Sequence, residues 1–152
     1  METTHKLNDS TVNGLQKLCK FCHDSAEGYR TAAGELASST LVEAFGNIAD
    51  SRAAMRDELV GMLGMSHEDI PDSGTMLGNV HRWWTEARSA ISSTDDQAVV
   101  AEAIRGENTI EDEYKDVLKD TAGSPATNVL HSHLGSIKAC RETLESIVEA
   151  QR

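Results

Sequence analysis

The residues with the most distinctive chemical spacing form the run Cys19-Lys20-Phe21-Cys22-His23, which matches the C-x-x-C-H pattern of c-type haem attachment. That chemistry needs two thiols one helical turn apart and an adjacent imidazole as an axial ligand of the iron. Helical periodicity places Cys22 on an apolar stripe, where a small thiol packs well, and turns His23 away from that stripe. The first ten residues lack the apolar segment of a secretory signal, although attachment of this kind is normally extracytoplasmic. A c-type haem protein is therefore the most distant of three functional alternatives.

A second set of candidate ligands consists of Glu107, Glu111 and His133, which could hold iron or manganese in a helical core. A di-metal centre in a four-helix bundle needs inward carboxylates from all four helices and two Glu-x-x-His pairs. The sequence offers too few, because Asp24 lies off the apolar stripe of its helix and the cation Arg52 stands on the stripe of the next. A metal-binding oxidase or iron-handling protein is accordingly the second alternative, behind a bundle whose metal site is absent or degraded.

The two charged residues on the apolar stripes, Arg52 and Glu107, are predicted to form a buried ion pair with Tyr29 nearby. Arg52 lies twelve residues after Thr40 and Glu107 lies twelve after Asp95, the starts of their predicted helices. If these two helices run parallel, both residues fall in one layer of the bundle. An unpaired charge in such a place would cost several kcal/mol, so we expect the two to meet. The pair is interpreted as structural, with a role in fixing helix register.

The elements that carry these residues are predicted to be helices. From Leu15 to Leu36, apolar residues recur at steps of three and four, which is typical of an α-helix packed in a bundle. Aromatic residues make up only 4% of the chain, and no alternating run indicates a strand. The fold class is therefore all-α. The predicted bundle helices span about 10–38, 40–63, 95–120 and 125–150, with a helical crossover at about 73–92.

These helices predict one domain, residues 1–152, in which residues 1–8 are frayed. The predicted architecture is a ferritin-like four-helix bundle whose crossover returns the chain along the bundle. A plain up-down array of five helices is the alternative. Short turns at 38–40 and 121–124 make the first pair and the last pair of bundle helices antiparallel in both arrangements.

The formal net charge of −11 bears on binding partners. A surface of this sign repels nucleic acid and anionic lipid, and no cluster of Lys and Arg offsets it. No apolar run approaches the roughly 20 residues of a membrane span. We expect a cytoplasmic protein that binds neither nucleic acid nor membrane, and whose three cysteines are reduced.

Three short motifs, in this order and spacing, resemble the signature of an uncharacterised bacterial family. They are Gly28-Tyr29-Arg30 with Ala32-Ala33, then Gly74-x3-Gly78-x2-His81-Arg82-x-Trp84, then Arg105-Gly106-Glu107 with Tyr114. The resemblance covers roughly residues 7–120. Members of that family are described as ferritin-like four-helix-bundle proteins of unknown function, so the resemblance implies the bundle fold and brings no activity or functional residues.

The function expected from these observations is that of a non-enzymatic helical bundle without a cofactor, acting through protein–protein contacts. Three apolar residues predicted to face outward, Phe21, Met76 and Trp83, favour a homodimer. His81 and Trp84 are interpreted as packing residues rather than a binding patch.

Overall fold

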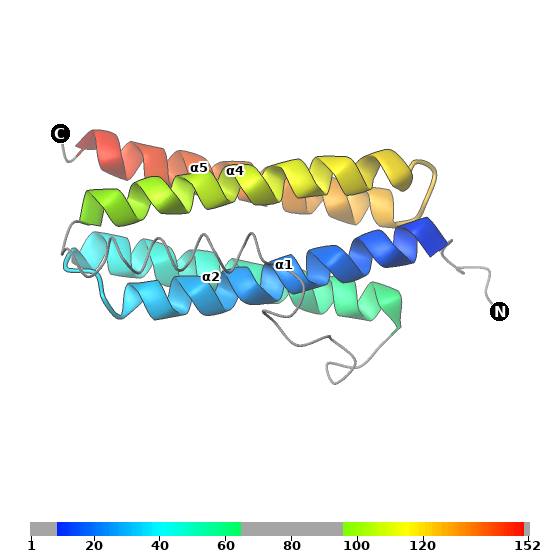
Figure 1. Ribbon diagram of the computed structural model, residues 1–152, viewed down its shortest axis with the longest axis horizontal. Coiled ribbons are helices and arrows are strands. Elements are labelled where there is room, and N and C mark those ends of the chain that lie inside the picture. The colour runs from blue at the N-terminus through cyan, green and yellow to red at the C-terminus, as the bar shows by residue number, and fades with distance from the viewer. Residues whose placement is uncertain (1–8, 65–95, 151–152) are drawn as a thin grey trace.

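The computed structural model describes residues 9–64 and 96–150, which form four helices of 25 residues each. These helices are α1 (Asp9–Ala33), α2 (Ser39–Leu63), α4 (Asp96–Asp120) and α5 (Ala126–Ala150) (Figure 1). No strand occurs in these two ranges, so the all-α prediction is confirmed. The expected crossover helix at about 73–92 and the expected frayed residues 1–8 lie outside the described residues.

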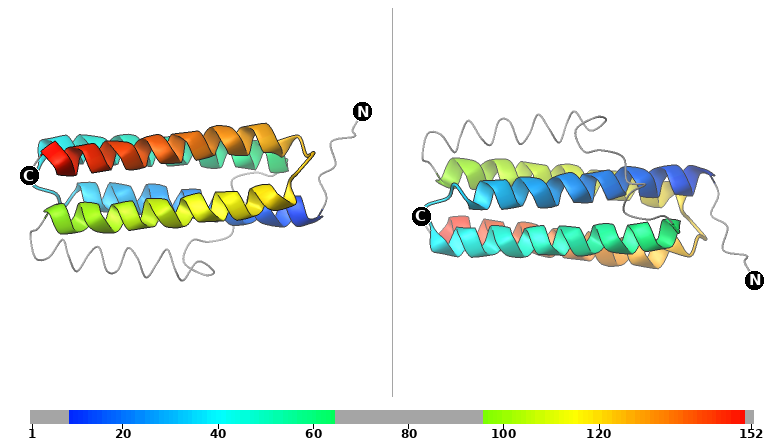
Figure 2. Two further views of the ribbon diagram at one scale, coloured as in Figure 1. Left: turned by 90° about the horizontal axis from the view of Figure 1, so that it is seen from above. Right: turned by 90° about the horizontal axis from the view of Figure 1, so that it is seen from below.

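The four helices form a bundle of two antiparallel pairs, α1 with α2 and α4 with α5. The pairs join because α1 also contacts α4 and α2 also contacts α5, so α2 and α4 lie across the diagonal (Figure 2). Figure 1 shows these two diagonal helices running in the same direction. Side chains from α2 and α4 that point to the bundle axis can therefore meet at matching heights.

The first turn differs from the sequence prediction, since α1 ends at Ala33 rather than near Ser38. Gly34 has a low helix propensity, and its N–H bonds to the carbonyl of Thr31 at 3.2 Å, which tightens the last turn. Ser38 adopts an extended conformation as the N-cap of α2, and its hydroxyl accepts from the N–H of Leu41. The connection therefore occupies 34–38 and not 38–40.

The carboxylate of Asp96, in the first turn of α4, holds this connection in place. It accepts hydrogen bonds from the backbone N–H groups of Ala37 at 3.3 Å and Ser38 at 2.9 Å. A single acid thus ties the α1–α2 connection to the start of α4.

The core consists of two apolar clusters stacked along the bundle. One contains Leu18, Leu59 and Leu130, and the other contains Phe45, Val100 and Leu144. Arg52 and Glu107 lie between the two clusters in sequence on their helices and are both buried. The apolar stripes are therefore interrupted by charge near the middle of the bundle.

The buried arc of α1 is wider than its periodicity predicts. Twelve of its residues are buried, against eight in α2, eight in α4 and six in α5. Phe21, expected to face outward, is only 4% exposed and belongs to a core cluster, and Asp24, expected off the buried face, is also buried. The periodicity gave the centre of the stripe but not its width, so the Phe21 prediction was wrong. The other outward candidates, Met76 and Trp83, lie outside the described residues, as do His81 and Trp84.

Candidate functional site

Arg52 and Glu107 meet at the centre of the bundle, where both side chains are excluded from solvent (0% and 1% exposed). The contact is bidentate: Nη1 of Arg52 donates to Oε2 of Glu107 at 2.9 Å, and Nη2 donates to Oε1. The hydroxyl of Tyr29 on α1 donates to the same Oε2 at 2.6 Å. Nη1 of Arg52 also donates to Oγ of Ser25 at 3.0 Å. Three helices thus contribute to one polar layer, which we call the Arg52 layer (Ser25, Tyr29, Arg52 and Glu107).

The electrostatics of the Arg52 layer keep the guanidinium of Arg52 charged and the phenol of Tyr29 neutral. Burial opposes the charge of Arg52, but the Glu107 carboxylate outweighs burial and raises the pKa of the guanidinium. Burial, and then the charge of Glu107, raise the pKa of Tyr29 well above its ordinary value, so the phenol stays a neutral donor. The guanidinium also lies 6.0 Å from the centre of the Tyr29 ring, within reach of a cation–π attraction. The layer is therefore a structural unit and not a set of groups poised for proton transfer, and Nε of Arg52 is its one buried nitrogen without a hydrogen-bond partner.

A second polar layer lies seven residues away along two of the helices, since Cys22 precedes Tyr29 on α1 and Tyr114 follows Glu107 on α4 by that spacing. Nε2 of His133 lies 2.8 Å from Oε1 of Glu58, and Nδ1 lies 2.9 Å from the hydroxyl of Tyr114.

The same hydroxyl lies 3.3 Å from the thiol sulfur of Cys22. We call these four residues, Glu58, His133, Tyr114 and Cys22, the His133 relay.

The inner residues of the His133 relay are buried, whereas Glu58 at its outer end is exposed to solvent. Cys22 and Tyr114 are fully buried and His133 nearly so, whereas the side chain of Glu58 is 61% exposed. Burial raises the pKa of the Cys22 thiol to about 11, although the hydrogen bond between Cys22 and Tyr114 opposes this. Burial also raises the pKa of Tyr114 well above its ordinary value. The thiol and the phenol are therefore both protonated at neutral pH.

The three candidate metal ligands do not converge. Both oxygens of Glu107 are engaged by Arg52, and the two nitrogens of His133 face Tyr114 and Glu58. Glu111 accepts from Arg141 and forms an ion pair with Lys115 at 3.0 Å. Burial favours the neutral form of Glu111, but these two cations outweigh it and lower its pKa. Across residues 9–64 and 96–150, no group of three or more His, Cys, Asp or Glu side chains is placed to hold a metal ion.

The residues of the C-x-x-C-H pattern do not fit a covalently attached haem. Cys19 and Cys22 are buried in an apolar core cluster, and burial raises the pKa of both thiols. Nδ1 of His23 lies 3.2 Å from Nη1 of Arg56, on the partly buried side of α1. Neither thiol reaches a surface where a porphyrin would lie, because helix packing covers both.

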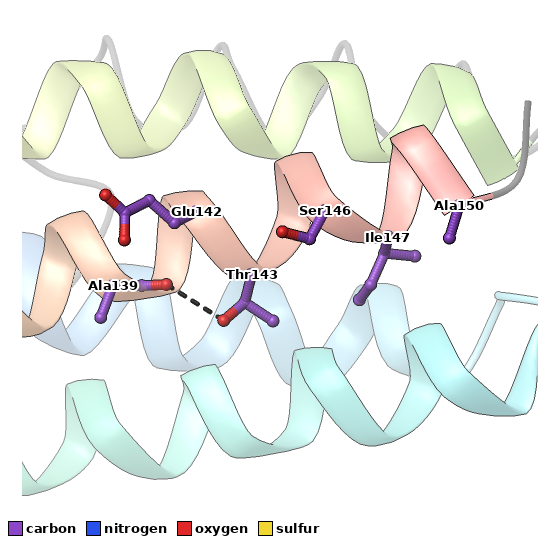
Figure 3. Close-up of a pocket in the computed structure, with 6 residues that line it drawn as sticks. All are labelled: Ala139, Glu142, Thr143, Ser146, Ile147 and Ala150. Atoms are coloured by element: carbon purple, nitrogen blue, oxygen red, sulfur yellow. Dashed lines mark hydrogen bonds between the residues drawn. The ribbon is translucent and has the colours of Figure 1, made fainter.

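A surface depression of about 500 Å³ lies on the exposed side of α5 (Figure 3). It is lined by Ala139, Glu142, Thr143, Ser146, Ile147 and Ala150, all on this one helix. The hydrogen bond drawn there, from Thr143 Oγ1 to the Ala139 carbonyl at 3.0 Å, is internal to the helix. Side chains from one face of a single helix do not enclose a ligand, so this depression is not the candidate site.

Sequence reasoning brought Arg52, Glu107 and Tyr29 together, but it did not assemble the His133 relay. Cys22 was considered as a haem-attachment residue or a packing thiol and His133 as a metal ligand, and Glu58 was not considered at all. The available signal was the common spacing of seven residues between the two layers on α1 and α4. Glu58 carries no such signal, because its long side chain reaches α5 from a largely exposed position.

Comparison with known proteins gives one family match. A family model for a domain of unknown function matches residues 10–120, from α1 to the end of α4. No curated protein and no solved structure matches the chain. Within the described parts of the chain, no helix has the length and apolarity needed to cross a membrane.

Proposed function

Because the chain belongs to the DUF2383 family, whose function is unknown, we propose a function from the geometry of its own core. The proposal is a non-enzymatic, ferritin-like bundle without a metal site, which acts as a structural or regulatory protein through contacts with other proteins. The observation that carries it is the buried Arg52–Glu107 pair on the bundle axis. That position is where a metal-binding bundle would place its carboxylates.

The pair disfavours metal binding for an energetic reason. A metal ion at Glu107 would have to displace a bidentate guanidinium and the Tyr29 hydroxyl. It would also leave the charge of Arg52 buried without a partner, and losing one member of a buried pair costs about 3–5 kcal/mol. Cation repulsion between Arg52 and a divalent ion adds to that cost.

The ferritin-like part of the proposal is supported by the helix directions. Two antiparallel pairs with α2 and α4 parallel give the order of directions that this class of bundle has. The three cysteines are all free thiols, which supports a reducing compartment such as the cytoplasm.

The protein contacts are proposed to use the acidic surface rather than an apolar one. Since Phe21 is buried, Val42 is the single large hydrophobic residue exposed among those that the structure describes. A homodimer built on outward apolar residues therefore has less support than the sequence suggested. A partner with a basic surface fits the net charge of −11 better.

Metal analysis tests the proposal directly. We expect wild-type protein purified without chelator to contain iron and manganese far below one equivalent, as measured by inductively coupled plasma mass spectrometry. The matched control is Glu107→Gln, which keeps the shape of the side chain and removes its charge. Stoichiometric metal in the wild type that is lost in Glu107→Gln would overturn the proposal in favour of a metal-binding bundle.

A further inference from the structure

The His133 relay links solvent to a thiol in the dry core, and each of the four helices contributes one of its groups. Glu58 comes from α2, His133 from α5, Tyr114 from α4 and Cys22 from α1. All three of its links are within hydrogen-bond distance, between 2.8 and 3.3 Å. The relay is separate from the Arg52 layer, and it does not rest on the proposed function.

The direction of each hydrogen bond follows from the outermost group. An ionised carboxylate only accepts, so Nε2 of His133 carries the proton that faces Glu58. The Nδ1 of a neutral imidazole is then an acceptor, and the Tyr114 hydroxyl donates to it. The Tyr114 oxygen is left to accept from the S–H of Cys22. All donors therefore point from the core toward the surface.

We propose that the His133 relay is a proton path between bulk solvent and the thiol of Cys22. In one transfer along it, the S–H bond of Cys22 breaks and its proton binds the Tyr114 oxygen. The former Tyr114 proton moves to Nδ1 of His133, and the Nε2 proton moves to the Glu58 carboxylate. The sulfur keeps its electron pair, one proton has moved outward, and no oxidant or reductant is involved.

The groups that surround Cys22 determine whether its resting form is the thiol or the thiolate. Among them, Arg52 of α2 stabilises a Cys22 thiolate, whereas Cys19 of α1 and burial oppose one. Because burial dominates, the protonated thiol is the resting state, and the path exchanges protons without storing charge. Cys22 thereby becomes a site that is open to protons and closed to larger reagents, since its side chain is 0% exposed.

Hydrogen–deuterium exchange at sulfur tests the path, because the S–H and S–D stretching bands are separate in the infrared. Two full-length proteins with one thiol each are compared after transfer to D₂O. One keeps Cys22 (Cys19→Ala with Cys140→Ala) and the other keeps Cys19 (Cys22→Ala with Cys140→Ala). Both thiols lie in the same core cluster, but Cys19 is not part of the relay. We expect Cys22 to exchange at least about tenfold faster than Cys19, which needs the helices to open.

Two matched substitutions locate the path in the protein that keeps Cys22. Tyr114→Phe removes one link and should slow exchange about tenfold or more, to a rate set by local opening. Tyr29→Phe removes an equally buried hydroxyl from the Arg52 layer, and because it breaks no link of the path it should not slow exchange. Equal rates for Cys22 and Cys19, or unchanged exchange in Tyr114→Phe, would overturn the proposal. Circular dichroism shows whether the variants fold. If Tyr114→Phe does not fold, the comparison of the exchange rates of Cys22 and Cys19 tests the proton path by itself.

Discussion

Arg52 and Glu107 lie on the two parallel helices at opposite corners of the bundle, and their side chains meet across its axis. The contact joins α2 to α4, which do not form one of the antiparallel pairs. Tyr29 from α1 binds the same carboxylate oxygen. Substitutions in the Arg52 layer can therefore measure how a buried charge contributes to the free energy of unfolding.

The first prediction concerns the unequal cost of removing one or both charges. Glu107→Leu should lower the free energy of unfolding by about 3–5 kcal/mol, because it leaves Arg52 charged and buried. The double variant Arg52→Leu with Glu107→Leu should lose clearly less, since no charge is left in the core. Urea denaturation monitored by circular dichroism measures both. Equal losses in the two variants would contradict a buried pair.

The second prediction concerns the Tyr29 hydroxyl. Tyr29→Phe should destabilise the protein by about 1–3 kcal/mol, because it removes a hydrogen bond to a buried charge. In the background of the Arg52→Leu and Glu107→Leu double variant, the same change should cost almost nothing. This cycle isolates the hydrogen bond from the loss of packing. A cost that is the same in both backgrounds would assign the effect to packing alone.

The third prediction compares two helical glycines. A Cβ added at Gly14 of α1 would lie 2.7 Å from Cγ1 of Val117 on α4, so Gly14→Ala should destabilise the bundle by forcing these helices apart. A Cβ added at Gly46 of α2 would meet no atom within 4 Å apart from the local backbone of its own helix, so Gly46→Ala should raise the free energy of unfolding by up to about 1 kcal/mol. Thermal unfolding ranks the two variants. A stabilised Gly14→Ala would mean that α1 and α4 approach less closely here.

The fourth prediction is a loss of stability at alkaline pH. Burial raises the pKa of Cys22 from its ordinary value of 9.0 to about 11. Between these values the unfolded chain releases a proton that the folded protein keeps, so rising pH favours unfolding. The contribution of the buried Cys22 thiol to the free energy of unfolding is fully present below pH 9.0 and is lost as the pH rises to about 11.

The size of that loss is about 2–3 kcal/mol, since each unit of pKa corresponds to about 1.4 kcal/mol. Tyr29 and Tyr114 act in the same direction at higher pH, because their pKa values are also raised by burial. Chemical denaturation between pH 8 and 11 should therefore give a shallower decline in Cys22→Ala than in the wild type. Parallel declines would show that the thiol does not titrate differently on folding.

Much of the fold could be predicted from apolar spacing and capping residues. Ser124 ends the predicted turn at 121–124, and its hydroxyl accepts from the N–H of Ala126 at the start of α5. Arg52 and Glu107 could be placed in one layer because each lies twelve residues after the predicted start of its helix. The helices begin one residue earlier and one residue later than predicted, at Ser39 and Asp96, and the two side chains still meet. Counting residues from a helix start predicts the height of a side chain along the bundle, because that height depends on one helix alone.

The remaining features depend on relationships between helices. The start of α2 is fixed by the Ser38 cap and by Asp96, which belongs to another helix. Phe21 is buried because the covered arc of α1 is broad, and periodicity does not give that breadth. Glu58 joins the His133 relay through the reach of a long side chain across to α5. These contacts exist only after the helices have packed.

The bidentate Arg52–Glu107 contact also has an evolutionary consequence. A lineage that replaces one of these residues first must pass through a protein with an isolated charge in its core, which selection would remove. The two positions are therefore expected to change together across the family. Relatives that carry an aliphatic residue in place of the arginine should also have lost the acid.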